Sequence, residues 1–321
     1  MNRKIFRAVT AAAFVLILSV QAQAARMLIP VGKVVGLSLS EGSVTVVAFD
    51  DELGASAREA GVQIGDEILS VDGCRIDSAE DLHQALCRSD GEVRLKLCRD
   101  NRECQVKVSP ALTDDGPRLG VYIREGVTGI GTVTYYDPVK KTFGTLGHGV
   151  SDKRGQLAEM ISGQVCRASV VSVKRGQCGH PGQLRGAVSA GEILGELTEN
   201  TPFGVFGAGA EWSGEALPAA EREEVQTGPA QILSNVTGDA VEAFSVQILK
   251  IYEPDQHPGR DVMIQVTVPE LLEITGGIVA GMSGSPIIQD GKLVGAVTHV
   301  LVNDPTTGYG IFIENMLDAA A

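Results

Sequence analysis

One serine near the C-terminal end of the chain has the surroundings of a nucleophile. Ser283 lies within residues 281–286, Gly-Met-Ser-Gly-Ser-Pro, so small residues stand on both sides of its hydroxyl. Glycine adopts positive φ at little cost and lets the backbone approach a substrate closely. The amides of Gly281 and Ser283 are therefore candidate donors to a developing oxyanion. The competing interpretation is a Gly/Ser-rich turn that does no chemistry.

The residues after this serine predict the element that positions it. Ile287 and Ile288 are apolar, Asp290-Gly291 is a turn signal, and a second apolar run covers residues 293–300. This pattern is typical of a tight loop that leads into a β-hairpin. An esterase nucleophile instead stands in G-x-S-x-G between a strand and a helix. The proline and the hairpin do not fit that arrangement, so an esterase is the weaker hypothesis.

A serine nucleophile needs a general base, and His148 is the best candidate among the five histidines. It lies in residues 143–150, at the end of an apolar segment, with Gly147 before it and Gly149 after it. Because both neighbours of His148 are glycines, a substrate and a second loop can approach its side chain. The alternative is an incidental histidine in a glycine-rich turn. The other histidines have ordinary surroundings: His83 on a predicted helix, His180 and His257 before prolines, and His299 at the end of the predicted hairpin.

Length and composition limit the classes of protein that can carry this site. With 321 residues, 44% of them hydrophobic, the chain can form two or three globular domains. Aromatic residues are only 4%, but the 39 glycines and the many valines favour β-rich architecture with frequent turns. A formal net charge of −13 argues against a nucleic-acid partner and gives no support for binding to anionic lipid. We expect no cofactor.

Residues 1–24 are typical of a secretory signal peptide or an N-terminal membrane-targeting segment. Positively charged residues come first, followed by an apolar run at residues 8–20 and by Ala-Gln-Ala at residues 22–24. The run is about 13 residues long, which is short for a membrane-spanning helix. We expect this segment to be cleaved, and we expect the protein to be exported to an extracytoplasmic compartment.

The six cysteines give little sign of chemistry. Cys98 and Cys104 lie symmetrically about Asn101 in a predicted hairpin, so they could face each other and form a disulfide. Residues 178–180, Cys-Gly-His, resemble part of a metal site, but no second pair of ligands stands at zinc spacing. We therefore predict no metal, and we treat most of the cysteines as buried or unpaired thiols.

Residues 28–108 form the first predicted domain. Its centre, residues 57–73, reads Ala-x-x-Ala-Gly-x-x-x-Gly-Asp-x-Ile-x-x-Val-Asp-Gly and resembles the PDZ domains of bacterial exported proteases. PDZ domains bind a peptide C-terminus by β-augmentation, and backbone amides hold the terminal carboxylate. The alternative is a closed groove that only packs against its neighbour. The resemblance implies a carboxylate loop at Gly36 and Leu37, a strand edge at Leu39 and a groove helix at residues 82–86.

The rest of the chain predicts a linker and a second, larger domain. The linker is a polar stretch with proline and glycine at residues 109–118. From residue 119 to residue 321, short apolar strands follow one another closely and helical periodicity is scarce. This pattern predicts an antiparallel β domain, either a sandwich or a barrel. The whole chain is therefore predicted to be mainly β.

Taken together, these segments resemble the SpoIVB peptidase family (sporulation stage IV protein B) of endospore-forming bacteria. The similarity includes the PDZ-like unit, residues 147–149 around His148, and residues 281–286. It extends to Glu-Asn-Thr-Pro-Phe-Gly-Val-Phe-Gly at residues 199–207 and to Val-Thr-His-Val-Leu-Val-Asn-Asp-Pro-Thr-Thr-Gly-Tyr-Gly at residues 297–310. The resemblance implies a PDZ domain followed by a chymotrypsin-like double β-barrel peptidase domain, with Ser283 as nucleophile and His148 as general base.

The same resemblance implies a biological role. Members of the family are serine endopeptidases that cross the membrane bounding the developing spore and act in the intermembrane space. They cleave a regulatory membrane protein, which releases an intramembrane protease and so activates a late sigma factor. They also cleave themselves. We therefore expect a membrane-associated protein as substrate, and a peptide C-terminus or a segment of the chain itself in the PDZ groove.

One position departs from the family pattern. The family usually has an aspartate just before a proline, as the partner of the histidine, and this chain has Val268 there. Valine neither accepts the imidazole N–H nor stabilises an imidazolium. Another acid, a backbone carbonyl or a water therefore replaces it, or turnover is weakened by up to about 10⁴-fold. Asp261 and Glu270 are acids near Val268 in the sequence, and Asp137 and Asp152 are acids near His148.

Two hypotheses about function therefore stay open at this point. The first is an exported serine endopeptidase with a regulatory PDZ domain. The second, motivated by Val268, is a catalytically weakened or inactive PDZ-bearing binding protein on the same fold.

Overall fold

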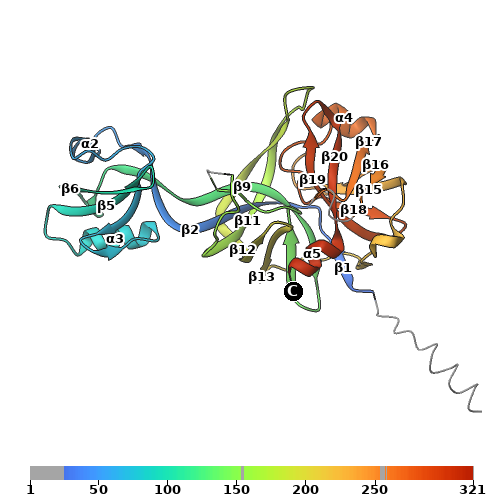
Figure 1. Cartoon of the computed structure of the whole chain (residues 1–321), viewed down its shortest axis with the longest axis horizontal. Helices are drawn as coiled ribbons and strands as arrows, with labels where there is room; N and C mark the ends of the chain where they lie inside the picture. The colour runs from blue at the N-terminus through green and yellow to red at the C-terminus, as the bar shows by residue number, and fades with distance from the viewer. Residues whose placement is uncertain (1–24, 153–154, 254–256, 258, 321) are drawn as a thin grey trace, which may run out of the picture.

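The structure, a computed structural model, describes residues 25–152, 155–253, 257 and 259–320. The predicted targeting segment at residues 1–24 lies outside the described residues. Figure 1 shows a small domain at one end of the molecule and a larger body at the other, joined by strands β2 and β9. Within the described residues, no helix is long and apolar enough to cross a membrane.

Six strands of the larger body close into a first barrel. Their order is β9-β10-β13-β12-β11-β2, and β2 also pairs with β9, which completes the ring. Alternate residues of β2, Val35, Leu37 and Leu39, point into its core, because successive side chains of a strand face opposite sides. Two short strands, β1 and β14, continue the sheet beyond β9. The bounds are β1 (Met27–Pro30), β2 (Val34–Phe49), β9 (Val121–Asp137), β10 (Thr142–Thr145), β11 (Ser162–Lys174), β12 (Gln183–Thr201), β13 (Gly204–Ala208) and β14 (Leu217–Pro218).

Six further strands form a second closed barrel, in the order β15-β16-β17-β20-β19-β18. Its core contains Ile232, Val246, Ile264 and Val297 from four of these strands. The bounds are β15 (Gly228–Ser234), β16 (Glu242–Ile251), β17 (Val262–Val266), β18 (Pro286–Gln289), β19 (Lys292–Leu301) and β20 (Asp304–Phe312), with the helices η1 (Arg222–Glu224), α4 (Pro269–Thr275) and α5 (Ile313–Ala319). The predicted mainly β fold, with a double β-barrel after an N-terminal domain, is therefore confirmed.

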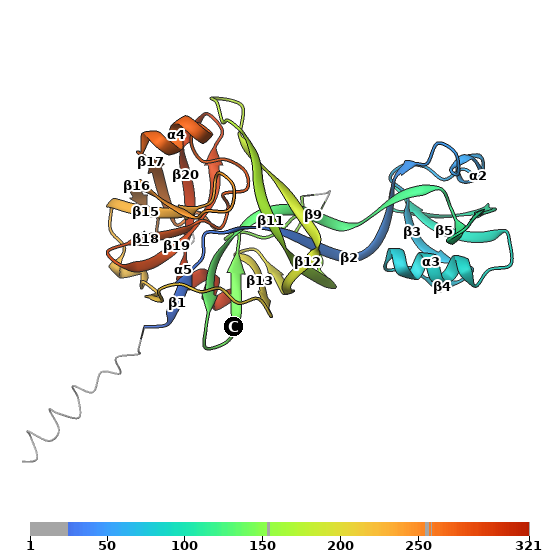
Figure 2. The same ribbon diagram turned by 180° about the vertical axis from the view of Figure 1, so that it is seen from behind.

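The small domain is inserted between the two strands that start the first barrel. The outer part of β2 pairs there with β3 and with the first residues of β9. Seen from behind in Figure 2, β2 and β9 again run side by side from the small domain into the larger body. Its other elements are α2 (Ala55–Glu59), β3 (Glu67–Val71), β4 (Cys74–Arg75), α3 (Ala79–Cys87), β5 (Val93–Arg99), β6 (Arg102–Val108), β7 (Ala111–Thr113) and β8 (Gly116–Arg118).

Two local predictions from the sequence are confirmed. Ser78 caps α3, because its hydroxyl accepts a hydrogen bond from the amide of Asp81. The predicted hairpin after the serine loop is β18 and β19, joined at Asp290 and Gly291. Both turn residues have positive φ, 50° and 75°, as the favoured hairpin turn requires.

The predicted PDZ groove at Gly36, Leu37 and Leu39 is wrong. These residues lie in the inner part of β2, which pairs on one edge with β9 and on the other with β11. Gly36, for example, is opposite Ile130 on one side and Cys166 on the other. Since both edges of the strand are occupied, no peptide can be added to it. The three residues belong to the first barrel.

The expected limits of the first domain also change. β1 and residues 34–39 of β2 pair with strands of the first barrel, although both fall inside the predicted domain at residues 28–108. The predicted linker at residues 109–118 contains β7 and β8, a short hairpin beside α3. The small domain therefore starts within β2 and continues into the first residues of β9.

The predicted hairpin around Asn101 exists, but Cys98 and Cys104 do not face each other across it. Cys98 is opposite Glu103 and Cys104 is opposite Leu97, so the two thiols point to opposite faces of the sheet. All six cysteines are free. No group of three or more potential metal ligands occurs among the described residues, including those around Cys178.

Candidate active site

His148 is presented by a tight turn that follows β10. Leu146 and Gly147 both have positive φ, 67° and 68°, which turns the chain sharply before the histidine. A Cβ on Gly147 would lie 2.9 Å from Cγ2 of Thr298, and one on Gly149 would lie 2.6 Å from the carbonyl oxygen of Thr201. The two glycines that flank His148 are thus needed for close packing on both sides.

The motif at residues 199–207 holds the other end of this loop. Asn200 accepts a hydrogen bond from the amide of Val150 and donates to the carbonyl oxygens of Val150 and Ala158, all at 2.9 Å. One amide side chain therefore ties the segment after His148 to the end of β12. This gives a structural reason for a motif that the sequence alone left unexplained.

Ser283 is fixed from the opposite side by β9. The amide of Thr132 donates to the carbonyl oxygen of Ser283 at 3.0 Å, and the hydroxyl of Thr132 donates to the carbonyl oxygen of Gly281 at 2.8 Å. Gly281 and Gly284 have positive φ, 99° and 95°. A Cβ on Gly284 would lie 2.0 Å from the carbonyl oxygen of Thr132, so only glycine lets the loop approach β9 this closely.

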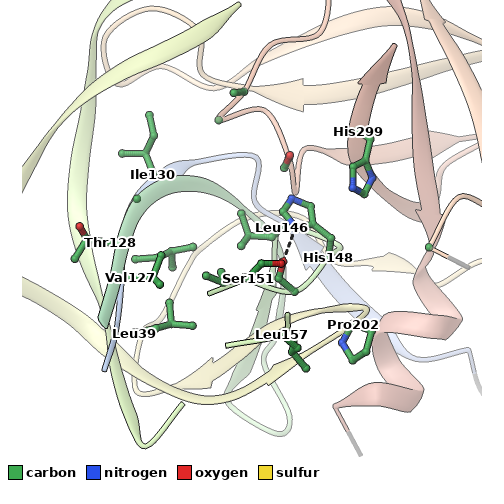
Figure 3. Close-up of a pocket in the computed structure, with 18 residues that line it drawn as sticks. Leu39, Val127, Thr128, Ile130, Leu146, His148, Ser151, Leu157, Pro202 and His299 are labelled. Carbon is green, nitrogen blue, oxygen red and sulfur yellow. Dashed lines mark hydrogen bonds between the residues drawn. The ribbon is translucent and has the colours of Figure 1, made fainter. Parts of the chain in front are cut away.

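The predicted site residues meet at one cavity between the two barrels. Its volume is about 710 Å³, and its lining includes His148, Gly281 and Ser283. The lining also includes His299, from β19 of the second barrel. Figure 3 shows the imidazoles of His148 and His299 next to each other at one end of this cavity, and their ring centroids lie 5.2 Å apart.

The hydroxyl of Ser283 and the ring of His148 each have a backbone partner. Ser283 Oγ donates to the carbonyl oxygen of Thr298 at 2.8 Å. His148 Nδ1 lies 2.9 Å from the carbonyl oxygen of Gly149, and since a carbonyl only accepts, Nδ1 carries the proton. Nε2 is then the basic nitrogen. Transfer of the serine proton to Nε2 requires Ser283 Oγ to exchange its bond to Thr298, and catalytic bonds often tighten only when substrate binds.

Both imidazoles in the cavity are kept neutral near pH 7. Burial lowers the pKa of His148, partly offset by its bond to the carbonyl of Gly149. Burial, followed by the nearby His148 and Arg260, lowers the pKa of His299 to about 4. A neutral His148 is the form that can accept a proton.

No carboxylate among the described residues lines the cavity. Asp261 instead accepts bonds from the amide of Phe312 and the side chain of Asn315, and Asp137 pairs with Arg26 at 2.6 Å. Asp152 accepts from the amide of Gln156 within its own turn, and Glu270 is exposed in the first turn of α4. Val268 is the residue that precedes α4, and it packs against the core of the second barrel. Of the open alternatives for the third group, the geometry favours the backbone carbonyl of Gly149.

Two amides are available for the predicted oxyanion hole. Among the described residues, no backbone carbonyl accepts a hydrogen bond from the amide of Gly281 or Ser283, whereas the neighbouring amides of Met282, Gly284 and Ser285 are all bonded. Both residues line the cavity. Their placement suits the stabilisation of a negative oxygen beside Ser283.

Sequence reasoning missed His299 as part of this site. The sequence predicts His299 near the end of a strand, and this is correct for its backbone, because β19 ends at Leu301. The signal that it belongs to the cavity is its place in the long motif at residues 297–310, just after Thr298, whose carbonyl holds Ser283.

A second cavity, of about 550 Å³, lies in the small domain between α3 and the start of β9. Leu82 and Leu86 of α3 line it, as the sequence predicted for a groove helix. The facing side is Leu119, Gly120 and residues 121–123 of β9. Sequence reasoning missed this wall, although a glycine just before an alternating strand, Leu119-Gly120-Val121-Tyr122-Ile123, was a signal for it.

Comparison with known proteins gives the class first. A family model for the PDZ domain matches residues 34–109, and a model of a serine-peptidase family matches residues 116–317. Together with the cavity that holds Ser283 and His148, these matches define a serine peptidase that carries a PDZ domain.

The chain belongs to the SpoIVB peptidase S55 family, because the model of that family matches more than half of its length. The Rv3671c protease from M. tuberculosis, in its active form, is similar at 18% sequence identity with a TM-score of 0.37, over 60% of this chain and 72% of that one. The PDZ domain of the SdrC-like protein from Listeria monocytogenes is similar at 19% identity with a TM-score of 0.22, over 25% of this chain and 85% of that one. No curated protein matches the sequence.

Proposed function

We propose that this peptidase is an exported endopeptidase of spore formation that cleaves a regulatory, membrane-associated protein and thereby starts intramembrane proteolysis. The observation that carries the catalytic part is the cavity between the barrels, which holds a serine, a neutral histidine and two unbonded amides. Family membership supports the pathway. The apolar segment at residues 8–20 and the Ala-Gln-Ala run after it support export.

The geometry supports a conventional acyl-transfer mechanism. Ser283 Oγ attacks the carbonyl carbon of the scissile peptide while His148 Nε2 takes the serine proton. The amides of Gly281 and Ser283 donate to the oxygen that becomes negative. His148 then passes the proton to the leaving amine, and water repeats the sequence to release the acyl group. Throughout, the carbonyl of Gly149 holds the proton on Nδ1 and so keeps Nε2 basic.

The PDZ domain supplies a site for a peptide C-terminus in the same proposal. The cavity between α3 and the start of β9 lies beside Leu119 and Gly120 and has apolar walls from Leu82 and Leu86. Self-cleavage near the N-terminus follows if the chain's own segment reaches the active site. These roles are proposals that the family resemblance and the groove support.

The experiment that tests the catalytic proposal is labelling with a fluorophosphonate probe. The mature protein should react, whereas Ser283→Ala and His148→Ala should lose reactivity by a factor of about 10⁴ or more. His180→Ala is the matched control, because His180 is exposed and lies outside the cavity. Folded wild-type protein that fails to react would favour the binding-protein hypothesis.

A further inference from the structure

Three cavities follow one another along a single strand, β9. The cavity of the PDZ domain is lined by its residues 121–123. A smaller one of about 210 Å³ is lined by Arg124 and residues 126–128. The active-site cavity is lined by residues 127–130. One strand thus runs from the peptide groove to the nucleophile with a cavity beside each successive part.

Within the described part of the chain, one edge of this strand has no strand partner over the same length. Along its other edge, β9 pairs with β2 from Val121 to Thr132. On the free side, among the described residues, partner strands begin only at Val133, where β10 joins it. An unpaired strand edge presents amides and carbonyls that are ready to bind another extended chain.

The free edge points at the nucleophile. The amide of Thr132 donates to the carbonyl oxygen of Ser283, and its carbonyl accepts from the amide of Leu146. Backbone groups of a strand alternate between its two edges, so the amides and carbonyls of Ile130 and Thr128 face the same side as those of Thr132. Both residues line the active-site cavity.

We propose that the free edge of β9 is one continuous track for the unfolded C-terminal tail of the protein substrate. The tail's carboxylate lies at Leu119 and Gly120, and the tail pairs with β9 by β-augmentation. Because the loop precedes the strand, a chain that ends there must run antiparallel to β9, and its preceding residues lead toward Ser283. This inference rests on the proposed function as an endopeptidase.

The track sets a spacing between the end of the substrate and the bond that is cut. From Val121 to Thr132 a strand advances roughly 3.3 Å per residue, and a paired antiparallel chain advances equally, so the cut falls about 10–14 residues before the C-terminus. Gly126, with φ 73° and close to the carbonyl of Leu39, bends β9 between the domains. The range allows for this bend. Scissile-bond choice is therefore set by distance as well as by sequence.

The chemistry of the groove selects an apolar last residue. Leu82, Leu86 and Leu119 line the cavity beside the proposed position of the carboxylate. Arg118, next to the loop, adds a positive charge to the lining, although it pairs with Asp115 at 3.3 Å and the lining also contains Asp50 and Glu80. The occupant is thus an extended tail with a free carboxylate and an apolar end.

The test measures where an unstructured peptide is cut. The probe is a library of synthetic peptides of about 30 residues, with randomised interiors and a free C-terminal valine, digested by the full-length mature protein and read by mass spectrometry. We expect C-terminal products of about 10–14 residues, and four added Gly/Ser residues before the valine should move the cut by the same number. Cuts that stay with the local sequence when the spacer is added would overturn the track.

A matched pair of variants tests the groove itself. His83→Glu places a negative charge in the lining of the PDZ cavity and should raise KM for free C-termini about tenfold. Gln105→Glu introduces a negative charge on an exposed residue of β6, outside the lining and outside the groove helix, and should leave KM unchanged. Equal KM values for the two variants would overturn the groove's role. Fluorophosphonate labelling of wild type in parallel separates the proposals, since labelling without fixed spacing removes only the track, and no labelling removes the catalytic proposal.

Discussion

His148 is oriented by a peptide carbonyl, and this changes what is expected of catalysis. In a full triad the acid holds the imidazole in the correct tautomer and stabilises the imidazolium. The carbonyl of Gly149 performs the first task, because it accepts the proton on Nδ1, but it carries no charge for the second. In a full triad, loss of the acid lowers turnover about 10⁴-fold because the imidazole takes the wrong tautomer. The carbonyl of Gly149 prevents that error, so only the missing charge weakens turnover here. We therefore expect a weakened enzyme with its proton-transfer geometry preserved.

The proposed general base, His148, is buried, and this predicts the pH dependence of the reaction. Burial lowers the pKa of His148, and the base acts only when neutral. As the pH falls, His148 stays neutral through the ordinary histidine range and is protonated only below it. The rate constant of fluorophosphonate labelling should therefore have its acid midpoint below about pH 6.5.

This profile is measured as the second-order rate of labelling between about pH 4 and pH 8, with circular dichroism at each pH to show that the protein is folded. Protonation of His299, whose pKa is about 4, falls at the acid end of the range. A midpoint at or above pH 6.5 in folded protein would contradict the assignment of His148 as the buried base.

At the scale of elements, the serine loop depends on its contact with β9. Gly284→Ala adds a Cβ 2.0 Å from the carbonyl oxygen of Thr132, at a residue with φ 95°. Backbone strain alone should cost about 1–3 kcal/mol, and the loop should move away from β9. We expect a lower free energy of unfolding and a large loss of labelling.

The control for this variant is Gly191→Ala in β12. A Cβ there would meet nothing within 4 Å, and no positive φ is present, so its effect should stay within about 0.5 kcal/mol. Both variants are compared by urea denaturation and by labelling. Wild-type labelling of Gly284→Ala would show that the close approach to β9 is dispensable.

The small domain depends on one buried carboxylate. Asp66, from the Gly-Asp pair of the PDZ-like motif, is fully buried and pairs through both oxygens with Arg99 at 2.7 Å. The guanidinium also donates to the carbonyl oxygen of Gly61. Arg99→Ala leaves the buried charge without its partner and should destabilise the domain by about 3 kcal/mol.

The comparison is with Arg75→Ala, which breaks an exposed pair with Asp77 and should cost at most about 1 kcal/mol. Hydrogen exchange of the β3 and β5 amides measures both effects in the full chain. Similar exchange rates in the two variants would show that the Arg99 pair contributes no more than a surface pair.

The sequence predicts elements whose signals are local and fails where pairing is distant. The hairpin after Ser283 was predictable because Asp290-Gly291 fixes its turn, and α3 because Ser78 caps it. The importance of Ser283 and His148, which the structure brings to one cavity, was predicted because both residues stand in glycine-rich frames. Leu37 was misplaced because its neighbours come from β9 and β11, far along the chain, and no local pattern reveals them.

The missed parts of the two cavities have the same cause. His299 and Leu119 each lie in segments with clear strand signals, but what they face is decided by packing between elements. Orientation of His148 by the carbonyl of Gly149 is a question of side-chain geometry, and residue types alone could not select it from the alternatives.

At the scale of the whole molecule, the PDZ domain is an insertion that the first barrel does not need for closure. Leu39 of β2 is directly opposite Val127 of β9, so a short turn can join the two strands there. We predict that replacing residues 41–125 by a Gly–Ser turn leaves a folded protein that reacts with fluorophosphonate.

The same excision should abolish any preference for peptides with a free C-terminus, because the groove between α3 and the start of β9 is removed. Circular dichroism, labelling and the peptide digest check the three parts of this prediction. An unfolded product would show that the barrel needs the inserted domain.

The order of the strands along the chain also determines when the active site can form during synthesis. A chain is made from its N-terminal end, and β2 cannot complete its ring until β9, and later β13, have been added. The loop of Ser283 is held by Thr132 of the first barrel, which is synthesised earlier, and its hydroxyl is held by Thr298 of the second barrel, which is synthesised later. The active site therefore forms only near the end of synthesis, and a chain interrupted earlier has no peptidase activity toward the proteins around it.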